Sequence, residues 1–330
     1  MDAISAIREA ARKNFPDAMK TASLDPETDF ETISYRLYAF EFSWDIEKAL
    51  EFALFRTYGV PSISRLLVNT GEFENRPRKR YDDTALILAE IMENGLGSVR
   101  GRRSISRMNA MHGRYRISNE DMLYVLSTFV CEPIRWLERF GRRPMTEKEK
   151  RAWFLYYRSL GHRMGIRQIP DKLATLMEWN VAYESARFQF AESNRKIAMV
   201  TTDLLLGFYL PRCLCWVGRP VVRSLMDPPL LRSMGYEPAP VWMRYLVPGA
   251  LRIRAGVLRW FPRRTGPRLL TQSRRPTYPE GYRIEELGTS HAVSYLPSLP
   301  VGAYLAREGR SPAKGPPSFV VAGATRLPSE

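Results

Sequence analysis

The chain contains few histidines, so each one can be considered separately as a candidate catalytic or metal-binding residue. The sequence contains only His112, His162 and His291. If the segment before His112 is helical, Arg107 falls close to the same face, because the two residues are five positions apart. A neutral imidazole can bind iron axially, and guanidinium groups can pair with propionates, which is what a haem site requires. A structural histidine explains the same spacing, so the residues alone leave both interpretations open.

The other candidate ligands give weaker indications. His162 is expected in the last turn of a helix, where a partly protonated imidazole interacts favourably with the helix dipole. His291 lies in a segment rich in Pro, Gly and Ser and is expected to be solvated. Cys213 and Cys215 form a CxC pair without a nearby histidine or further cysteine, which favours buried thiols over a metal site.

Common catalytic motifs and unusual compositions are both absent. The chain has no GxGxxG, GxxxxGK[ST], GxSxG, HExxH or CxxC motif, which removes the main support for phosphate loops, dinucleotide folds, elbow-type hydrolases and zinc peptidases. Of its 330 residues, 45% are hydrophobic and 26% are charged, as in a globular protein rather than a disordered one. Three cysteines are too few for a disulfide scaffold.

Helical patterns dominate the segments that must position these residues. Apolar residues recur at helical spacing in 45–55 and 81–93, and cap-like spacings begin further helices at Ser118 and Thr146. Another helix is expected to begin at Pro170. No stretch shows the sustained alternation of a strand, so the sequence predicts an all-α protein.

The expected organisation is a single large multi-helix domain. It covers residues 31–288, after a helical N-terminal extension at 1–30. Residues 289–330 are rich in Pro and Gly and are expected to form a flexible tail.

Positive charge is concentrated late in the chain. The net charge is +15, and two thirds of it lies in residues 201–330. Such a surface attracts nucleic acid, anionic lipid or the carboxylates of a cofactor. The apolar run at 197–217 contains Asp203 and Arg212, which favours a buried core helix over a membrane span. In 241–264, aromatic and aliphatic residues alternate with arginines, which fits either a membrane-surface segment or a helix with one core face and one basic face.

Eight ordered blocks between residues 45 and 288 resemble a known family, the MpaB-type oxygenases of fungi and bacteria, which share a catalytic domain with the latex-clearing rubber oxygenases. The blocks are FALFRTYGVPSISRLLVNTGEF at 52–73, KRYDDTALILAE at 79–90, RMNAMHGRYRISNEDMLYVL at 107–126, CEPIRWLERFGRRPMTEKEK at 131–150, LGHRMGIRQIP at 160–170, AYESARF at 182–188, SNRKIAMVTTDLLL at 193–206 and YPEGYRIEELG at 278–288.

This resemblance implies an all-helical domain with haem b that uses dioxygen on a hydrophobic substrate, such as a prenylated or terpenoid compound. The family's Arg-then-His motif falls on Arg107 and His112. The resemblance therefore implies His112 as the axial ligand of the haem iron, with His162 in reserve. Arg107 would pair with a propionate or polarise bound oxygen, and Asn109 and Tyr115 could hydrogen-bond near that oxygen, although both residue types are often structural.

Two positions qualify the resemblance. Many bacterial relatives have a second histidine in the next helix, and Leu126 stands there in this chain. Asp121, at the start of that helix, is expected to cap it rather than act as a base. Fungal members often carry an N-terminal membrane helix that this sequence does not show. We therefore expect a cytoplasmic protein, a protein peripheral on the ER or cytoplasmic membrane surface through 241–264, or a sequence that lacks an N-terminal piece.

Two other classes of function stay open on the sequence alone. A protein of the same fold could bind haem or a membrane surface without catalysis. The positive charge would also suit a nucleic-acid binder, but no recognised binding motif accompanies it, which makes nucleic acid the weakest partner.

Overall fold

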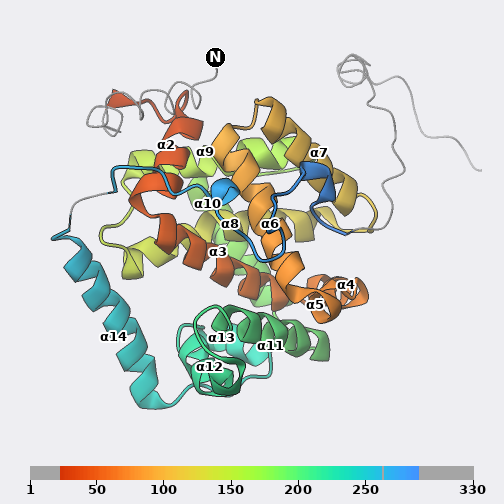
Figure 1. Cartoon of the computed structure of the whole chain (residues 1–330), viewed down its shortest axis with the longest axis vertical. Coiled ribbons are helices and arrows are strands. Elements are labelled where there is room, and N and C mark those ends of the chain that lie inside the picture. Colours follow the sequence, from red (N-terminus) through yellow and green to blue (C-terminus); the bar gives the residue numbers. More distant parts are fainter. Residues whose placement is uncertain (1–22, 262–263, 290–330) are drawn as a thin grey trace, which may run out of the picture. The chain divides into compact units, whose positions relative to one another are not determined.

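The computed structural model describes residues 23–261 and 264–289. In that part of the chain the secondary structure is helical, with an isolated bridge between Arg275 and Tyr278 and no strand, so the all-α prediction is confirmed (Figure 1). Most of the predicted extension at 1–30, His291 and nearly all of the tail at 289–330 lie outside the described residues, and those expectations stay predictions.

The helices follow one another with short connections. They are α2 (Phe30–Arg36), η3 (Leu37–Glu41), α3 (Ser43–Tyr58), α4 (Pro61–Asn69), α5 (Glu72–Asn75), α6 (Pro77–Asn94), α7 (Val99–His112), α8 (Asn119–Phe140), α9 (Glu147–Arg163), α10 (Leu173–Arg187), α11 (Glu192–Leu206), η4 (Arg212–Leu214), α12 (Cys215–Arg223), α13 (Pro228–Ser233), α14 (Val241–Leu258), η5 (Leu270–Gln272) and η6 (Ile284–Glu286).

Local sequence signals set several helix ends as expected. The Ser118 hydroxyl accepts from the backbone N–H of Asp121 at 3.0 Å at the start of α8. Thr146 and Glu149 form a complete capping box at the start of α9. Gly95, with φ of 94°, follows the end of α6 in a conformation that other residues rarely adopt.

The helix expected from Pro170 begins later than the sequence suggested. Gln168 has a φ of 58°, and the Asp171 carboxylate binds Arg158 of α9, so the chain is still turning through these residues. Lys172 is extended, and α10 begins only at Leu173.

The core lies where α3 packs along α8, α2 along α9 and α6 along α7. Its largest fully buried side chains come from several of these helices and include Trp153, Tyr35, Tyr58, Tyr124 and Phe42. Because α3 and α8 pack against each other over much of their length, they separate the two cavities described below.

After α14 the chain returns across α6 and α7 as a segment, residues 268–289, that we call the strap. The strap binds a row of buried carboxylates on α6. Its contacts are Leu270 N–H to Glu93 Oε1 at 2.7 Å, Thr277 Oγ1 to Asp82 Oδ2 at 2.6 Å, Tyr278 hydroxyl to Asp83, and Tyr282 hydroxyl to Glu90 Oε1 at 2.6 Å. Because a buried carboxylate without donors is costly, these contacts fasten the strap to α6.

The apolar run at 197–217 is not one helix. It is broken after Leu206, where α11 ends, and α12 begins only at Cys215. Asp203 forms an ion pair with Arg219 at 2.7 Å, which explains the charge inside this run. None of the helices in the described ranges has the length and apolar character needed to cross a membrane.

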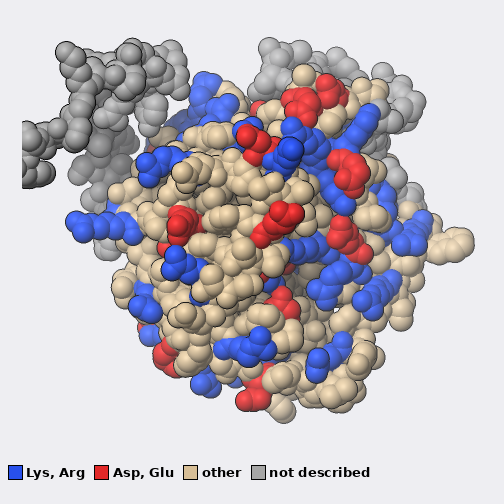
Figure 2. Space-filling view, turned by 180° about the vertical axis from the view of Figure 1, so that it is seen from behind, with Lys and Arg blue, Asp and Glu red and all other residues tan. Residues whose placement is uncertain are grey.

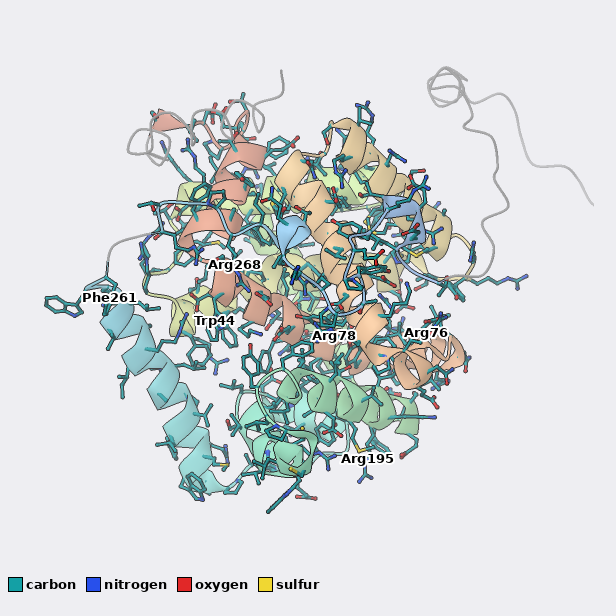
Figure 3. The ribbon with its side chains drawn as sticks, viewed as in Figure 1. Trp44, Arg76, Arg78, Arg195, Phe261 and Arg268 are labelled. Carbon is teal, nitrogen blue, oxygen red and sulfur yellow. The ribbon has the colours of Figure 1, made fainter. Side chains whose placement is uncertain are left out.

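Few side chains of helix α14 are buried. Only Pro248 and Ala255 are buried along it, and Arg254 ties it to Asp45 at 3.0 Å. The large side chains of its outer surface are exposed, and Figure 3 shows Phe261, just beyond its end, pointing away from the neighbouring helices. Pro248, Leu251 and Ala255 lie on the side that packs on the domain, so α14 has one inner face and one exposed face, and both environments expected from the sequence stay open.

Candidate functional site

His112 is the last residue of α7, a helix that runs back along α6. The start of α7 lies close to the end of α6. This close approach depends on Gly101, because a Cβ at that position would lie 1.9 Å from the carbonyl oxygen of Gly95. The Ser98 hydroxyl caps α7 by accepting from the Gly101 N–H at 2.9 Å. These contacts fix the start of α7 against the end of α6 and so bring His112 to the first turns of α6.

One ring nitrogen of His112 is left without a hydrogen-bond partner in the described part of the chain. Its Nδ1 atom is buried and has no hydrogen-bond partner among the described residues. Burial, with a smaller contribution from the positive charge of Arg80, lowers the pKa of His112 to about 4. The ring is therefore neutral at neutral pH and keeps a lone pair for a ligand.

Arg80 and Thr84 of α6 were missed by the sequence analysis. The Arg80 guanidinium donates to the Thr84 hydroxyl and lies 5.6 Å from the ring centroid of Phe73. Its charge also acts on His112. The only signal in the sequence was the spacing of four between Arg80 and Thr84, which places both on one face of a helix.

Thr84 lines a small cavity of about 70 Å³ between α3, α6, α8 and α9. Its walls are mainly apolar, including Leu54, Leu88, Phe129 and Leu160, and it has room for a few water molecules. A polar pair also lines this cavity, in which the Tyr81 hydroxyl donates to Glu51 Oε1 at 2.8 Å. Burial raises the pKa of Glu51, against the opposing effect of Lys48.

Arg107 lies on the same helix as His112, but its guanidinium forms hydrogen bonds to the strap. Its Nε donates to the carbonyl oxygen of Leu287 at 2.7 Å, and a terminal nitrogen donates to that of Thr289 at 3.4 Å. Burial and the neighbouring charge of Arg114 lower the pKa of Arg107. The structure thus gives Arg107 a positioning role for the strap, and pairing with a propionate stays a prediction.

The remaining predicted site residues do not gather around His112. The Asn109 amide donates to the Arg163 carbonyl oxygen at the end of α9, at 2.9 Å. Tyr115 is exposed in the turn after α7, and His162 is exposed in the last turn of α9. Their proposed contacts with a cofactor stay predictions.

Leu126 and Asp121 make contacts within the fold that stabilise the packing of α8. Leu126 is buried against α9, since a Cβ at Gly161 would lie 2.5 Å from its Cδ2. The Asp121 carboxylate accepts from the Tyr183 hydroxyl at 2.6 Å and from Ser62 at 3.0 Å. The side chain that caps α8 is therefore Ser118, and the expectation that Asp121 caps this helix holds only for its backbone N–H.

Protein side chains alone offer no metal centre in residues 23–261 and 264–289, where no group of three or more His, Cys, Asp or Glu could hold an ion. Cys213 is exposed and Cys215 is buried. Within those residues the candidate site is therefore one half-buried imidazole, that of His112, whose buried Nδ1 has no hydrogen-bond partner.

Comparison with known protein families shows which family this chain belongs to. The model of the family described as "ER-bound oxygenase mpaB/B'/Rubber oxygenase, catalytic domain" matches residues 57–265, more than half of the chain. The chain belongs to this family, and the resemblance seen in the sequence is confirmed.

Three relatives come from Penicillium. ER-bound oxygenase mpaB' of Penicillium brevicompactum is 34% identical over 69% of this chain and 58% of its own length. ER-bound oxygenase mpaB of Penicillium roqueforti is 34% identical over 67% of this chain and 80% of its own length. ER-bound oxygenase mpaB of Penicillium brevicompactum is 33% identical over 58% of this chain and 54% of its own length. The chain thus spans little more than half of both relatives from Penicillium brevicompactum.

Proposed function

We propose that this protein is a haem-dependent oxygenase that uses dioxygen to cleave or oxygenate a hydrophobic substrate, such as a prenylated or terpenoid compound. The observation that carries the proposal is the half-buried, neutral imidazole of His112, whose buried Nδ1 has no hydrogen-bond partner among the described residues. Membership of an oxygenase family supports the type of reaction.

The residues around His112 fit haem b in their chemistry. A haem needs only one protein side chain to hold its iron, and a neutral imidazole is its commonest ligand. Arg80 supplies a cation near the ring for a propionate. Arg107 uses two of the five N–H donors of a guanidinium on the strap, so it retains donors for a second propionate. Haem, when bound, would supply the activation of dioxygen.

The protein's own contribution is to position groups and to exclude water. Burial and the nearby charge of Arg80 keep the His112 ring neutral, and the strap binds α7 through Arg107. Asn109 and Tyr115 are less suited to contact bound oxygen, because the first binds the end of α9 and the second is exposed.

The ultraviolet-visible spectrum of protein expressed with haem supplied tests this proposal. We expect a Soret band in the parent protein and in His162→Ala, the matched control with an exposed imidazole. The band should be lost or shifted in His112→Ala. An unchanged band in His112→Ala would remove His112 as the ligand, and a folded parent without any band would refute haem binding.

Spectra under oxygen then separate catalysis from simple binding. A six-coordinate, low-spin spectrum that does not respond to oxygen would support a non-catalytic haem protein. For an oxygenase, prenylated substrates incubated under ¹⁸O₂ should give products that contain the label. Unlabelled substrate after incubation with a reduced, haem-loaded protein would contradict the proposal for the compounds tested.

We also propose that the segment 241–264 makes peripheral contact with a membrane, on the ER or another cytoplasmic membrane surface. Along it, Trp242 is 59% exposed, Tyr245 77% and Trp260 90%. The segment contains no Asp or Glu, and Arg244 and Arg252 are exposed beside the aromatic residues. Aromatic and basic residues together are typical of a helix that lies in the membrane interface.

On one face of the protein, the pattern of charge is unlike that of a nucleic-acid binder. On the face shown in Figure 2, basic and acidic side chains are interspersed, without a continuous basic stripe among the described residues. A nucleic-acid binder usually needs such a stripe. The name ER-bound, carried by the three relatives, agrees with a membrane surface.

Sedimentation with lipid vesicles tests this contact. The protein should bind vesicles of phosphatidylcholine with phosphatidylserine more tightly than vesicles of phosphatidylcholine alone. Each arginine near an anionic surface contributes about 1 kcal/mol, so Arg244→Gln with Arg252→Gln should weaken binding by about tenfold or more. Arg167→Gln, an exposed residue after α9, is the control. Equal binding to both vesicle types, or equal loss in the control, would contradict this contact.

A further inference from the structure

A second and much larger cavity lies on the other side of the α3–α8 pair. Its volume is about 870 Å³, and it is lined by residues of α3, α8, α10 and the stretch 225–233. Neither His112 nor Arg80 belongs to its lining. Sites for small molecules commonly have volumes of about 300–1,000 Å³, so this cavity has the size of a ligand site.

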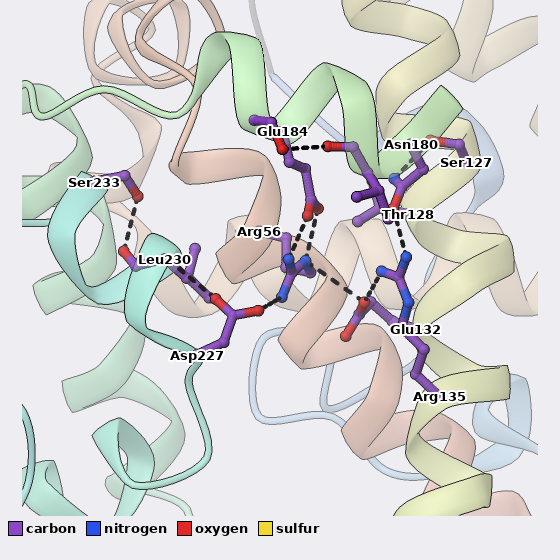
Figure 4. Close-up of polar contacts among 12 residues, drawn as sticks. Arg56, Ser127, Thr128, Glu132, Arg135, Asn180, Glu184, Asp227, Leu230 and Ser233 are labelled. Atoms are coloured by element: carbon purple, nitrogen blue, oxygen red, sulfur yellow. Dashed lines mark hydrogen bonds and ion pairs between the residues drawn. The ribbon is translucent and has the colours of Figure 1, made fainter. Parts of the chain in front are cut away.

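The inner wall of the cavity is an ion network centred on Arg56 (Figure 4). Arg56 donates to Glu184 Oε1 and to Asp227 Oδ2, both at 2.7 Å, and lies 3.5 Å from Glu132. Burial opposes its charge, but the hydrogen bond to Glu184 and the nearby carboxylates raise the pKa of Arg56. Glu132 also binds Arg135 at 2.7 Å.

The charge of this network excludes an anion from the inner wall. Two guanidinium groups, Arg56 and Arg135, face the three carboxylates of Glu132, Glu184 and Asp227, which leaves one net negative charge. The network is also satisfied by its own members, so it offers little to a cationic ligand.

Two other arginines that line the cavity are available. Arg139 of α8 and Arg232 of α13 are exposed, and neither has a carboxylate partner within the described ranges. Arg139 lies over the ring of Phe140, 4.8 Å from its centroid. The remaining lining carboxylate, Glu138, is paired with Lys150 at 3.1 Å. The outer part of the cavity therefore presents two uncommitted positive groups.

The lining of the cavity also contains several apolar side chains. Phe52 and Trp136 are in ring contact, with centroids 5.4 Å apart, and Phe188, Leu225 and Leu230 add further apolar surface. Such side chains favour the hydrocarbon part of a ligand rather than a second polar group.

We propose that this cavity binds an amphiphilic carboxylate, with its acid group at Arg139 and Arg232 and its apolar body against Phe52, Trp136 and Leu230. Charge-assisted hydrogen bonds from arginine to a carboxylate are among the strongest that a protein can offer. This site is separate from the proposed haem site and goes beyond the proposed oxygenase function, because binding needs no cofactor.

Calorimetry with two probes of equal chain length tests the site. Decanoate and decanol share a hydrocarbon body, and only decanoate carries the charge that the arginines would bind. We expect decanoate to bind at least about tenfold more tightly than decanol to the full chain. The paired variant Arg139→Gln with Arg232→Gln should remove this preference and leave the binding of decanol unchanged.

The exposed surface of α14 provides the matched control, since it too could adsorb an amphiphile. Arg244→Gln with Arg252→Gln removes the same number of charges there and should leave the decanoate preference intact. Circular dichroism of each variant checks that it is folded, which is expected because all four arginines are exposed.

A second measurement locates the probe directly. A decanoate analogue with a diazirine near the end of its chain, after irradiation, should label peptides that contain 225–233 or Trp136. Equal affinity for decanoate and decanol, unchanged affinity in the Arg139/Arg232 variant, or labelling confined to α14 would each overturn the proposal.

Discussion

Acidification should lower the free energy of unfolding through protonation of His112. This contribution can be measured by comparing the parent with a variant that lacks the imidazole. The pKa of His112 is about 4 in the folded chain and about 6.5 in an unfolded one. The folded state therefore binds the proton less readily than the unfolded state. The stability that results is fully present above about pH 6.5 and is lost as the pH falls towards 4.

The magnitude follows from the two pKa values. Over the whole interval the neutral imidazole contributes roughly 3 kcal/mol to the free energy of unfolding. Between pH 7 and pH 5 the same linkage predicts a loss of about 2 kcal/mol. Other buried groups, including Glu51, also titrate in acid, so the quantity to measure is the difference between the parent and a variant without this imidazole.

Urea unfolding of the haem-free protein at pH 7 and pH 5 provides the test. From pH 7 to pH 5 the parent should lose about 2 kcal/mol more than His112→Gln does. His162→Gln, which removes an exposed imidazole, should retain the parent's dependence on pH. If His112→Gln and the parent lose stability equally, the imidazole is solvated, and the reasoning about a neutral iron ligand fails with it.

Three further substitutions test the packing around the two sites. Arg56→Leu leaves buried carboxylates without their cation and should lower the free energy of unfolding by about 3–5 kcal/mol in urea; a loss below about 1 kcal/mol would contradict the network. Gly288→Ala should speed hydrogen exchange in the strap, because the new Cβ would lie 2.0 Å from the Met111 Sδ at a φ of 91°; unchanged exchange would show that the strap relaxes freely. Tyr278→Phe removes a donor to the buried Asp83 and should cost about 1–3 kcal/mol, visible as a lower thermal midpoint, and an unshifted midpoint would mean that Lys79 suffices.

The parts of the fold that local rules govern could be predicted. The helix starts at Ser118 and Thr146 depend on residues within a few positions of each other, and the structure has them as expected. The break in 197–217 and the late start of α10 were missed. In the latter case the cause is a contact with another helix, between Asp171 and Arg158.

The candidate site depends on contacts over longer distances in the sequence. His112 stood out because histidine is rare, but its isolation could not be inferred, since it arises from packing of α7 on α6. Arg80 precedes it by about thirty residues and becomes its neighbour only through that packing. Arg107 matched the expected motif, yet its donors are directed to the strap. The pattern of α14 fitted two environments, and the structure leaves both open, because one face of the helix is exposed and the other packs on the domain.

The strap lies beyond the end of the region that this chain shares with its family. The shared family region ends at residue 265, whereas several of the donors to the buried acids of α6 come from residues 268–289. A recombinant fragment cut at the homology boundary would retain Asp82, Glu90 and Glu93 without those donors. Such a fragment should therefore be less stable than one that continues to residue 289, because it lacks hydrogen bonds to buried carboxylates.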